Sequence, residues 1–266
     1  MIVVADVHQR RGGRTILAGV DVDVPPGTCT ALAGGNGAGK SSLLGAMVAL
    51  APVDRGSIRI AGHDPADRRA RARLAYLPEC FQPPAYLTGG ELLRTMRRLY
   101  GQPPDDSAIA AASAELGLSA TALDRPVAAY SKGMVQLLGL AGCLLSERPL
   151  LILDEPMSGL DPGARLRLRA ALARRAAAGA TVLFTTHLLA DAERFADWVA
   201  ILDTGRIVAA ASPAELRARY GCADLERAVV ANLGLGVAGS ACAVGPDGAA
   251  CADPPTRRGR VPGCGA

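Results

Sequence analysis

One glycine-rich stretch constrains this chain more than any other feature. It follows an apolar run of strand type, Thr28 to Ala33, and it precedes a helical run, Leu43 to Leu50. The order strand, glycine-rich loop, helix is typical of a phosphate-binding loop, because glycines let backbone N–H groups turn towards an anion at the helix N-terminus. The residues of this loop are Gly34, Gly35, Asn36, Gly37, Ala38, Gly39, Lys40, Ser41 and Ser42.

Two side chains of the loop are suited to a nucleoside triphosphate. Lys40 supplies a positive charge for the β- and γ-phosphates, and the Ser41 hydroxyl follows it as a ligand for Mg²⁺. The alternative is a glycine-rich turn that carries a solvated lysine. The position between a strand and a helix favours the phosphate site.

Polar side chains follow two further apolar runs. Leu150 to Leu153 reads as a buried strand that ends at Asp154 and Glu155, and Thr181 to Thr185 reads as another that leads to His187. Ligands of open α/β sheets sit at the carboxyl ends of strands, so Asp154 is predicted to hold the metal and Glu155 to accept a proton from the attacking water. The alternatives are two solvated acids and a structural histidine.

The order of strand and helix patterns predicts an α/β fold with a mostly parallel sheet. Ile2 to Val7 and Val20 to Val24, joined by a polar turn at Arg10 to Arg14, predict an antiparallel β edge. Helical patterns dominate from about 78 to 146, which indicates a helical subdomain inserted into the α/β frame. We predict one domain over 2–220. The segment 221–266 lacks periodicity and is predicted to be disordered.

Composition excludes several classes of function. The chain has 266 residues, a net charge of +4 and only 3% aromatic residues, so we expect no nucleic-acid partner. Its seven cysteines form no CxxC pair, which argues against a zinc site or a disulfide framework and favours a reducing cytoplasm. We expect no signal peptide. The most apolar window, 228–244, is interrupted by glycines and is not expected to span a membrane.

Five motifs together resemble the ATP-binding subunit of ABC transporters, and the resemblance covers roughly 2–220. They are the glycine-rich loop, the sequence Ser131, Lys132, Gly133 and Met134, the strand ending at Asp154 and Glu155, the segment 158–161, and His187. The resemblance implies a P-loop NTPase fold with a helical signature-motif subdomain. It also implies that 34–42 is the Walker A loop, Asp154 the Walker B aspartate, Glu155 the catalytic base and His187 the switch histidine.

The resemblance further implies partners and ligands. ATP and Mg²⁺ are the expected ligands, with Ser41, Asp154 and Glu79 near the metal. Residues Ser131 to Met134 form the signature motif, which binds ATP held by the other subunit of a homodimer or of a paired ATP-binding subunit, and Asp161 couples the two sites. Separate transmembrane permease subunits would hold the chain at the cytoplasmic face of the cell membrane as a peripheral subunit, and the wording of the signature is similar to that of exporters.

Three positions depart from the family pattern. Glu79 replaces a glutamine, Lys132 replaces a glycine, and Arg11 stands where most members stack an aromatic ring on adenine. We expect the Arg11 guanidinium to stack there instead. The alternative functions are a soluble ABC-type ATPase in DNA repair or on ribosomes, without a transport role, and an ATP-binding regulator without turnover.

A cluster of aromatic, proline and leucine residues lies in the segment from Glu79 to Tyr100. Its members are Phe81, Pro83, Pro84, Tyr86 and Leu87. We predict that this segment docks on the permease, and the alternative is a small core beneath the helical subdomain.

Overall fold

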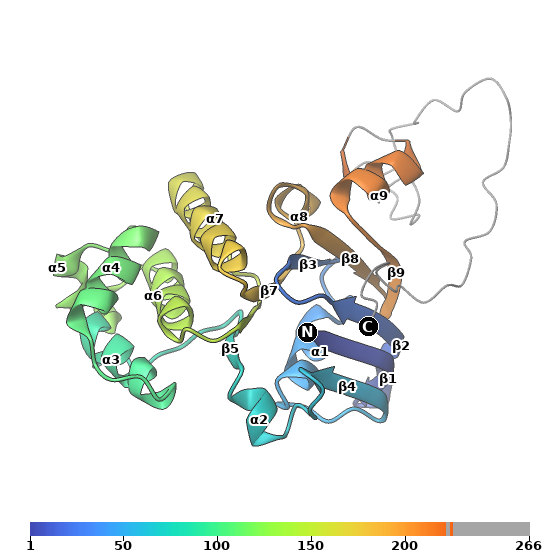
Figure 1. The fold of residues 1–266 in the computed structure, drawn as a ribbon, viewed down its shortest axis with the longest axis horizontal. Helices are drawn as coiled ribbons and strands as arrows, with labels where there is room; N and C mark the ends of the chain where they lie inside the picture. The colour runs from blue at the N-terminus through green and yellow to red at the C-terminus, as the bar shows by residue number, and fades with distance from the viewer. Residues whose placement is uncertain (222–223, 226–266) are drawn as a thin grey trace, which may run out of the picture.

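A computed structural model describes residues 1–221 and 224–225 of the chain (Figure 1). The strands are β1 (Ile2–Arg11), β2 (Arg14–Val24), β3 (Cys29–Ala33), β4 (Arg55–Ile60), β5 (Leu74–Leu77), β6 (Leu150–Leu153), β7 (Thr181–Thr186), β8 (Trp198–Asp203) and β9 (Arg206–Ala211). The helices are α1 (Lys40–Met47), α2 (Arg68–Arg71), α3 (Gly89–Leu99), α4 (Asp106–Leu116), α5 (Ala120–Leu123), the 3₁₀ turn η1 (Val127–Ala129), α6 (Lys132–Leu145), α7 (Pro162–Ala177), α8 (Leu189–Phe195) and α9 (Pro213–Tyr220).

Two sheets form the α/β part of the molecule. The larger sheet has the strand order β5-β6-β7-β3-β8-β9 and is parallel except for β9, which pairs with β8 in the antiparallel direction. The smaller sheet, β2-β1-β4, is antiparallel. The predicted fold class, a mostly parallel sheet with an antiparallel β edge, is therefore confirmed.

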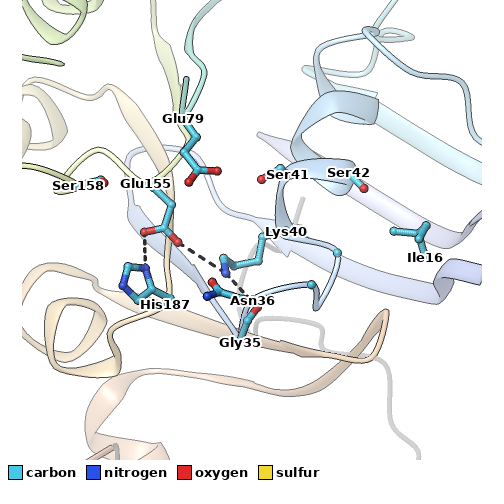
Figure 2. A pocket seen from close by; sticks show the side chains of 12 residues that line it. Ile16, Gly35, Asn36, Lys40, Ser41, Ser42, Glu79, Glu155, Ser158 and His187 are labelled. Carbon is cyan, nitrogen blue, oxygen red and sulfur yellow. Dashed lines mark hydrogen bonds and ion pairs between the residues drawn. The ribbon is translucent and has the colours of Figure 1, made fainter. Parts of the chain in front are cut away.

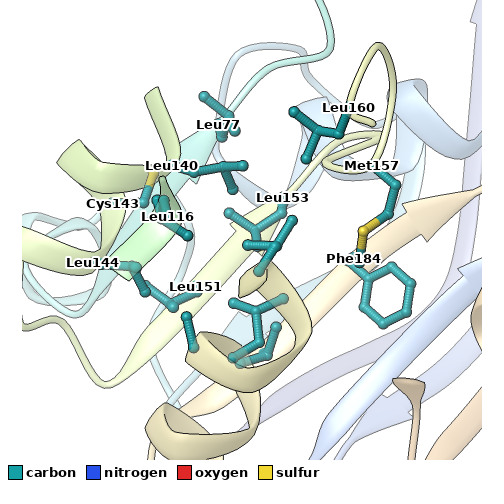
Figure 3. Packing of buried hydrophobic residues seen from close by; sticks show 14 of the residues in the cluster. Leu77, Leu116, Leu140, Cys143, Leu144, Leu151, Leu153, Met157, Leu160 and Phe184 are labelled. Atoms are coloured by element: carbon teal, nitrogen blue, oxygen red, sulfur yellow. The ribbon is translucent and has the colours of Figure 1, made fainter. Parts of the chain in front are cut away.

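Side chains of the central strands alternate between two hydrophobic cores. In β6, Leu151 and Leu153 belong to the core that also contains the helical subdomain, whereas Leu150 and Ile152 belong to the core beneath the small sheet. Figure 3 shows Leu151 and Leu153 in the first core, together with Phe184 of β7. A strand buried on both faces reads as a continuous apolar run, which explains why the sequence pattern was clear there.

Helices α3 to α6 lie between β5 and β6 in the chain and form a group at one end of the molecule (Figure 1). Helix α3 begins with a capping box, in which Thr88 accepts from the backbone of Glu91 and the Glu91 carboxylate accepts from the backbone of Thr88. Helix α6 is buried along most of its length. This helix anchors the group to the sheet through contacts with β5.

The structure also changes two local predictions. The predicted turn Arg10–Arg14 is too long, because Arg11 still pairs with Arg14 and only two glycines, both with positive φ, close the hairpin. Such glycines match the right-handed twist of paired strands. Helix α5 was not predicted, since four residues are too few to show a helical period.

The C-terminal prediction falls mostly outside the described residues. The predicted disorder of 221–266 and the apolar window 228–244 lie there, apart from 221, 224 and 225. Leu225 is fully buried in the larger core, and its backbone N–H donates to Glu193 of α8. The core thus includes a side chain beyond the predicted boundary at 220. Within the described part of the chain, no helix is both long and apolar enough to cross a bilayer.

Gly56 allows β4 to lie close to β1 in the small sheet. A Cβ at this position would lie 2.2 Å from the carbonyl oxygen of Asp6, at an irregularity in the pairing of β1 with β4, and φ is +90°. We expect Gly56→Ala to lower the free energy of unfolding by about 2–4 kcal/mol in urea titration, because backbone atoms cannot move aside.

Gly62→Ala is the matched control. Its φ is +82° but a Cβ would meet nothing within 4 Å, so this variant should lose only about 1 kcal/mol. Equal losses in the two variants would contradict the crowding argument.

Candidate functional site

The glycine-rich loop connects β3 to α1 at the carboxyl end of the larger sheet. Gly34 donates its N–H to the carbonyl of Thr186 at 3.2 Å, and a Cβ at Gly34 would lie 2.3 Å from the carbonyl oxygen of Leu202. Gly39, with φ +109°, precedes α1 and offers no side-chain cap. The first N–H groups of α1 therefore face the loop without a capping acceptor, as an anion site requires.

Lys40 points back over this loop. Its side chain is only 7% exposed, and Nζ donates to the carbonyl oxygens of Gly34 at 2.8 Å and Gly35 at 3.2 Å. Nζ also lies 3.6 Å from Oε1 of Glu155. The ammonium group is thus held over the glycine-rich loop, near the N-terminus of α1.

Glu155 lies between Lys40 and His187, and dashed lines join it to both in Figure 2. Its Oε2 is 2.8 Å from His187 Nδ1, and its side chain is 10% exposed. The backbone of Glu155 has φ +47°, which is unusual for a residue other than glycine. This conformation turns the carboxylate out of the strand direction and towards the phosphate loop.

Asp154, the preceding residue, has a different environment. It is 2% exposed, and its Oδ1 accepts a hydrogen bond from the Thr185 hydroxyl at 2.6 Å. The same hydroxyl accepts from the backbone N–H of Glu155 at 2.7 Å. Thr185 therefore fixes both acids. The sequence did not reveal this role, because a threonine in a strand indicates only β propensity.

Tyr76 of β5 is a neighbour of Asp154. Burial, assisted by the negative charge of Asp154, raises the pKa of Tyr76 to about 12.

These groups surround a cavity of about 410 Å³. Most of the predicted site residues line it (Figure 2). Ile16, which was not predicted, lines it as well, and so does Ser158, which the sequence singled out only as part of the 158–161 motif. Ile16 comes from β2 and Ser158 from the loop after Glu155. The full lining is Ile16, Gly35, Asn36, Gly37, Gly39, Lys40, Ser41, Ser42, Glu79, Glu155, Ser158 and His187.

Other predicted residues lie outside that lining within the described part of the chain. Arg11 is exposed at the end of β1. Ser131 caps α6 by accepting from the N–H of Met134 at 3.2 Å, and a Cβ on Gly133 would lie 2.8 Å from the carbonyl oxygen of Gly159. The 131–134 segment therefore packs against the loop that carries Ser158.

Asp161 caps the N-terminus of α7. Its carboxylate accepts from the N–H of Ala164 at 2.9 Å, and Pro162 occupies the first turn. An aspartate N-cap followed by proline in the first turn is a common helix start.

The donor set suits Mg²⁺ in its chemistry. Ser41 and Glu79 line the cavity, and Asp154 lies behind Glu155, so a hydroxyl and two carboxylates are available as oxygen ligands. Among the described residues, no cluster of three or more His, Cys, Asp or Glu side chains forms a metal site by itself. Mg²⁺ is usually bound by one or two carboxylates and completes its shell with phosphate and water.

Comparisons with known proteins agree with this geometry. A family model described as ABC transporter matches residues 17–158. A solved structure described as the ATP-binding subunit of an ABC transporter is 33% identical, has a TM-score of 0.79, and is matched over 87% of this chain and 98% of its own.

Three curated relatives were compared in sequence. An uncharacterised ABC transporter ATP-binding protein from Nostoc sp. is 37% identical over 75% of this chain, which spans only 61% of the length of that relative. A Nod factor export ATP-binding protein from Paraburkholderia xenovorans is 35% identical, over 83% of this chain and 74% of its own. A hemin import ATP-binding protein from Streptomyces coelicolor is 38% identical, over 78% and 76%.

Lys40→Ala should weaken the binding of MgATP by about 10-fold or more in calorimetry, because the substitution removes the cation from the phosphate loop. Arg10→Ala is the control, since Arg10 is exposed on β1 and lies outside the cavity lining among the described residues. Wild-type affinity in Lys40→Ala would show that the loop does not bind the triphosphate.

Proposed function

The chain belongs to the ABC transporter family of ATPases, and from that premise we propose that it is the energy-coupling subunit of a membrane transporter. In this proposal it binds MgATP at the 34–42 loop and hydrolyses it, and the hydrolysis drives separate permease subunits. One observation supports the assignment most strongly. Glu155 contacts both Lys40 and His187 at a single cavity beside the phosphate loop, although the three side chains come from three separate motifs.

Each of the three side chains has a distinct task in this proposal. Lys40 neutralises the β- and γ-phosphates, and it exchanges its loop carbonyl contacts for phosphate oxygens. Glu155 accepts the proton of the attacking water. His187 already contacts the Glu155 carboxylate, so it holds the base and senses the γ-phosphate from the same position.

Ser41, Asp154 and Glu79 would hold Mg²⁺ in this proposal. When bound there, the ion would supply positive charge next to the phosphate oxygens. Thr185 orients one oxygen of Asp154, and such support of a ligand side chain is usual beside a metal. Glu79, where the family has glutamine, adds one negative charge to the same cavity.

In this proposal the chain works as a homodimer or with a paired ATP-binding subunit. Ser131, Lys132, Gly133 and Met134 open α6 outside the lining of the chain's own cavity, so we propose that they cap ATP held by the other subunit. In the same dimer Asp161 would couple the two sites. The base of the nucleotide has two candidate contacts, Arg11 as predicted and Ile16, which lines the cavity.

We propose export as the direction of transport, with the chain bound peripherally at the cytoplasmic face of the membrane. The Nod factor relative and the exporter-like wording of residues 130–134 support export. The hemin import relative is similar to this chain at a comparable level, so sequence identity alone does not select the direction.

Glu155→Gln should keep MgATP binding and lower kcat at least about 100-fold, because the amide preserves the shape but cannot accept a proton. Analytical ultracentrifugation with ATP should then show an accumulated dimer. The control is Glu115→Gln, a half-buried acid on α4 that pairs with Arg174 and lies outside the cavity lining within the described residues. Hydrolysis at the wild-type rate by Glu155→Gln would remove this residue as the base.

The proposed permease contact lies on the segment from Glu79 to Tyr100. Its predicted cluster divides in two, because Phe81 and Leu87 pack against the core, whereas the Tyr86 side chain is 82% exposed. Tyr86→Ser should therefore reduce co-purification with the permease and leave basal ATPase activity unchanged.

Leu166→Ser is the matched control for the docking test. Leu166 is an apolar side chain that is 64% exposed on α7, outside the segment from Glu79 to Tyr100. If Tyr86→Ser and the control retain the permease equally well, the docking surface is not at Tyr86.

A further inference from the structure

A second ionic contact lies behind the cavity, between α7 and α8. Asp191, in the first turn of α8, is 9% exposed, and its Oδ2 is 3.9 Å from Arg165 of α7. Within the described residues this oxygen is buried and accepts no hydrogen bond. A buried carboxylate oxygen without a hydrogen bond is costly, so its presence calls for an explanation.

The two partners are tied to opposite sides of the catalytic cavity. Arg165 also donates from Nε to the carbonyl oxygen of Leu160 at 3.2 Å, directly before Asp161 and two residues after Ser158, which lines the cavity. Asp191 is four residues after His187. The pair therefore joins the loop on one side of Glu155 to the turn that carries His187 on the other.

The His187 turn has little other support from its own helix. Helix α8 has seven residues, Leu189–Phe195, and Leu188 at its N-cap offers no side-chain cap. The turn before it is held by the Thr186 hydroxyl, which accepts from the N–H of Leu188 at 3.0 Å and donates to the carbonyl oxygen of Leu188 at 3.3 Å. A contact from the first turn of α8 to another helix fixes where this turn lies. Asp191 is the acid in that turn.

We propose that the Asp191–Arg165 pair is a positioning device, which holds the His187 turn and the 158–161 loop in one arrangement for hydrolysis. This inference rests on the proposed ATPase function. Beyond that function, it assigns a coupling role to Asp191 and Arg165, which connect His187 to the loop of Asp161. Within the described part of the chain, neither residue lines the cavity.

The distance between Arg165 and Asp191 could also become shorter. At 3.9 Å the contact is an ion pair but not a hydrogen bond, and an approach of roughly 1 Å would create one with the free Oδ2. Burial raises the pKa of Asp191, and the nearby Arg165, Arg194 and His187 oppose that shift. The ionised acid is therefore costly to keep in place, as expected when a group serves function rather than stability.

The experiment measures steady-state ATPase kinetics of Asp191→Asn, Arg165→Gln and the double variant. Each single variant should lower kcat by about 10-fold with KM for ATP changed less than about two-fold, because the binding groups are untouched. The double variant should be no slower than the slower single variant, since both substitutions break one contact. Losses that multiply in the double variant, or wild-type kcat in both single variants, would overturn the proposal.

A purely structural role is tested by thermal unfolding of the same proteins. Asp191→Asn should melt no lower than the wild type, because it removes a charge whose burial is unfavourable. Loss of kcat that is explained by a lower melting temperature in both single variants would overturn the positioning role. Asp191→Glu keeps the charge and should recover part of the lost kcat.

Controls come from the same two helices. Glu193→Gln breaks the contact of α8 with Arg217 of α9, and Arg169→Gln removes the guanidinium that stacks on Phe195. Both should keep wild-type kcat.

Wild-type protein and Glu155→Gln are measured in parallel. If the wild type does not hydrolyse ATP, the proposed function fails, whereas an active wild type with fully active Asp191→Asn and Arg165→Gln removes only this inference.

Discussion

The carboxylate of Glu155 is the group on which the site depends, because three distant segments of the chain meet there. Lys40 approaches one oxygen and His187 the other, while the backbone N–H of Glu155 is held by Thr185. A carboxylate with only 10% of its side chain exposed would be costly to bury alone. The cation and the imidazole offset that cost, and the same contacts keep the acid facing the phosphate loop.

Two consecutive acids acquire different surroundings through the backbone between them. Asp154 directly follows the strand and is buried against the Thr185 hydroxyl, whereas Glu155 adopts a positive φ and turns into the cavity. One hydroxyl serves both residues, since it donates to the first and accepts from the second. Backbone strain at Glu155 is thus held in place by neighbouring contacts, a pattern that is common where chemistry occurs.

The sequence predicted the local parts of this arrangement well. The buried strands, such as β6 and β7, and the glycine-rich loop between β3 and α1 each depend on a few adjacent residues, so a local pattern is enough to predict them. Ile16, Thr185 and the Asp191–Arg165 pair were missed, because their roles depend on neighbours more than ten residues away in the chain. The placement of Arg11 outside the cavity lining likewise depends on how the β1–β2 hairpin lies over the sheet, which no local pattern records.

Sheet order explains why these scattered motifs converge. The larger sheet places four strands side by side in the order β5, β6, β7 and β3. Their carboxyl ends therefore lie in a row, and they are followed by Glu79, Glu155, His187 and the phosphate loop, respectively. The helical subdomain is inserted between β5 and β6, which are parallel (Figure 1). The chain therefore leaves the sheet for the subdomain at the carboxyl end of β5, beside Glu79, and returns at the amino end of β6. A shift of that subdomain would act on Glu79 through this first connection, which provides a physical route between a surface on those helices and the site of hydrolysis.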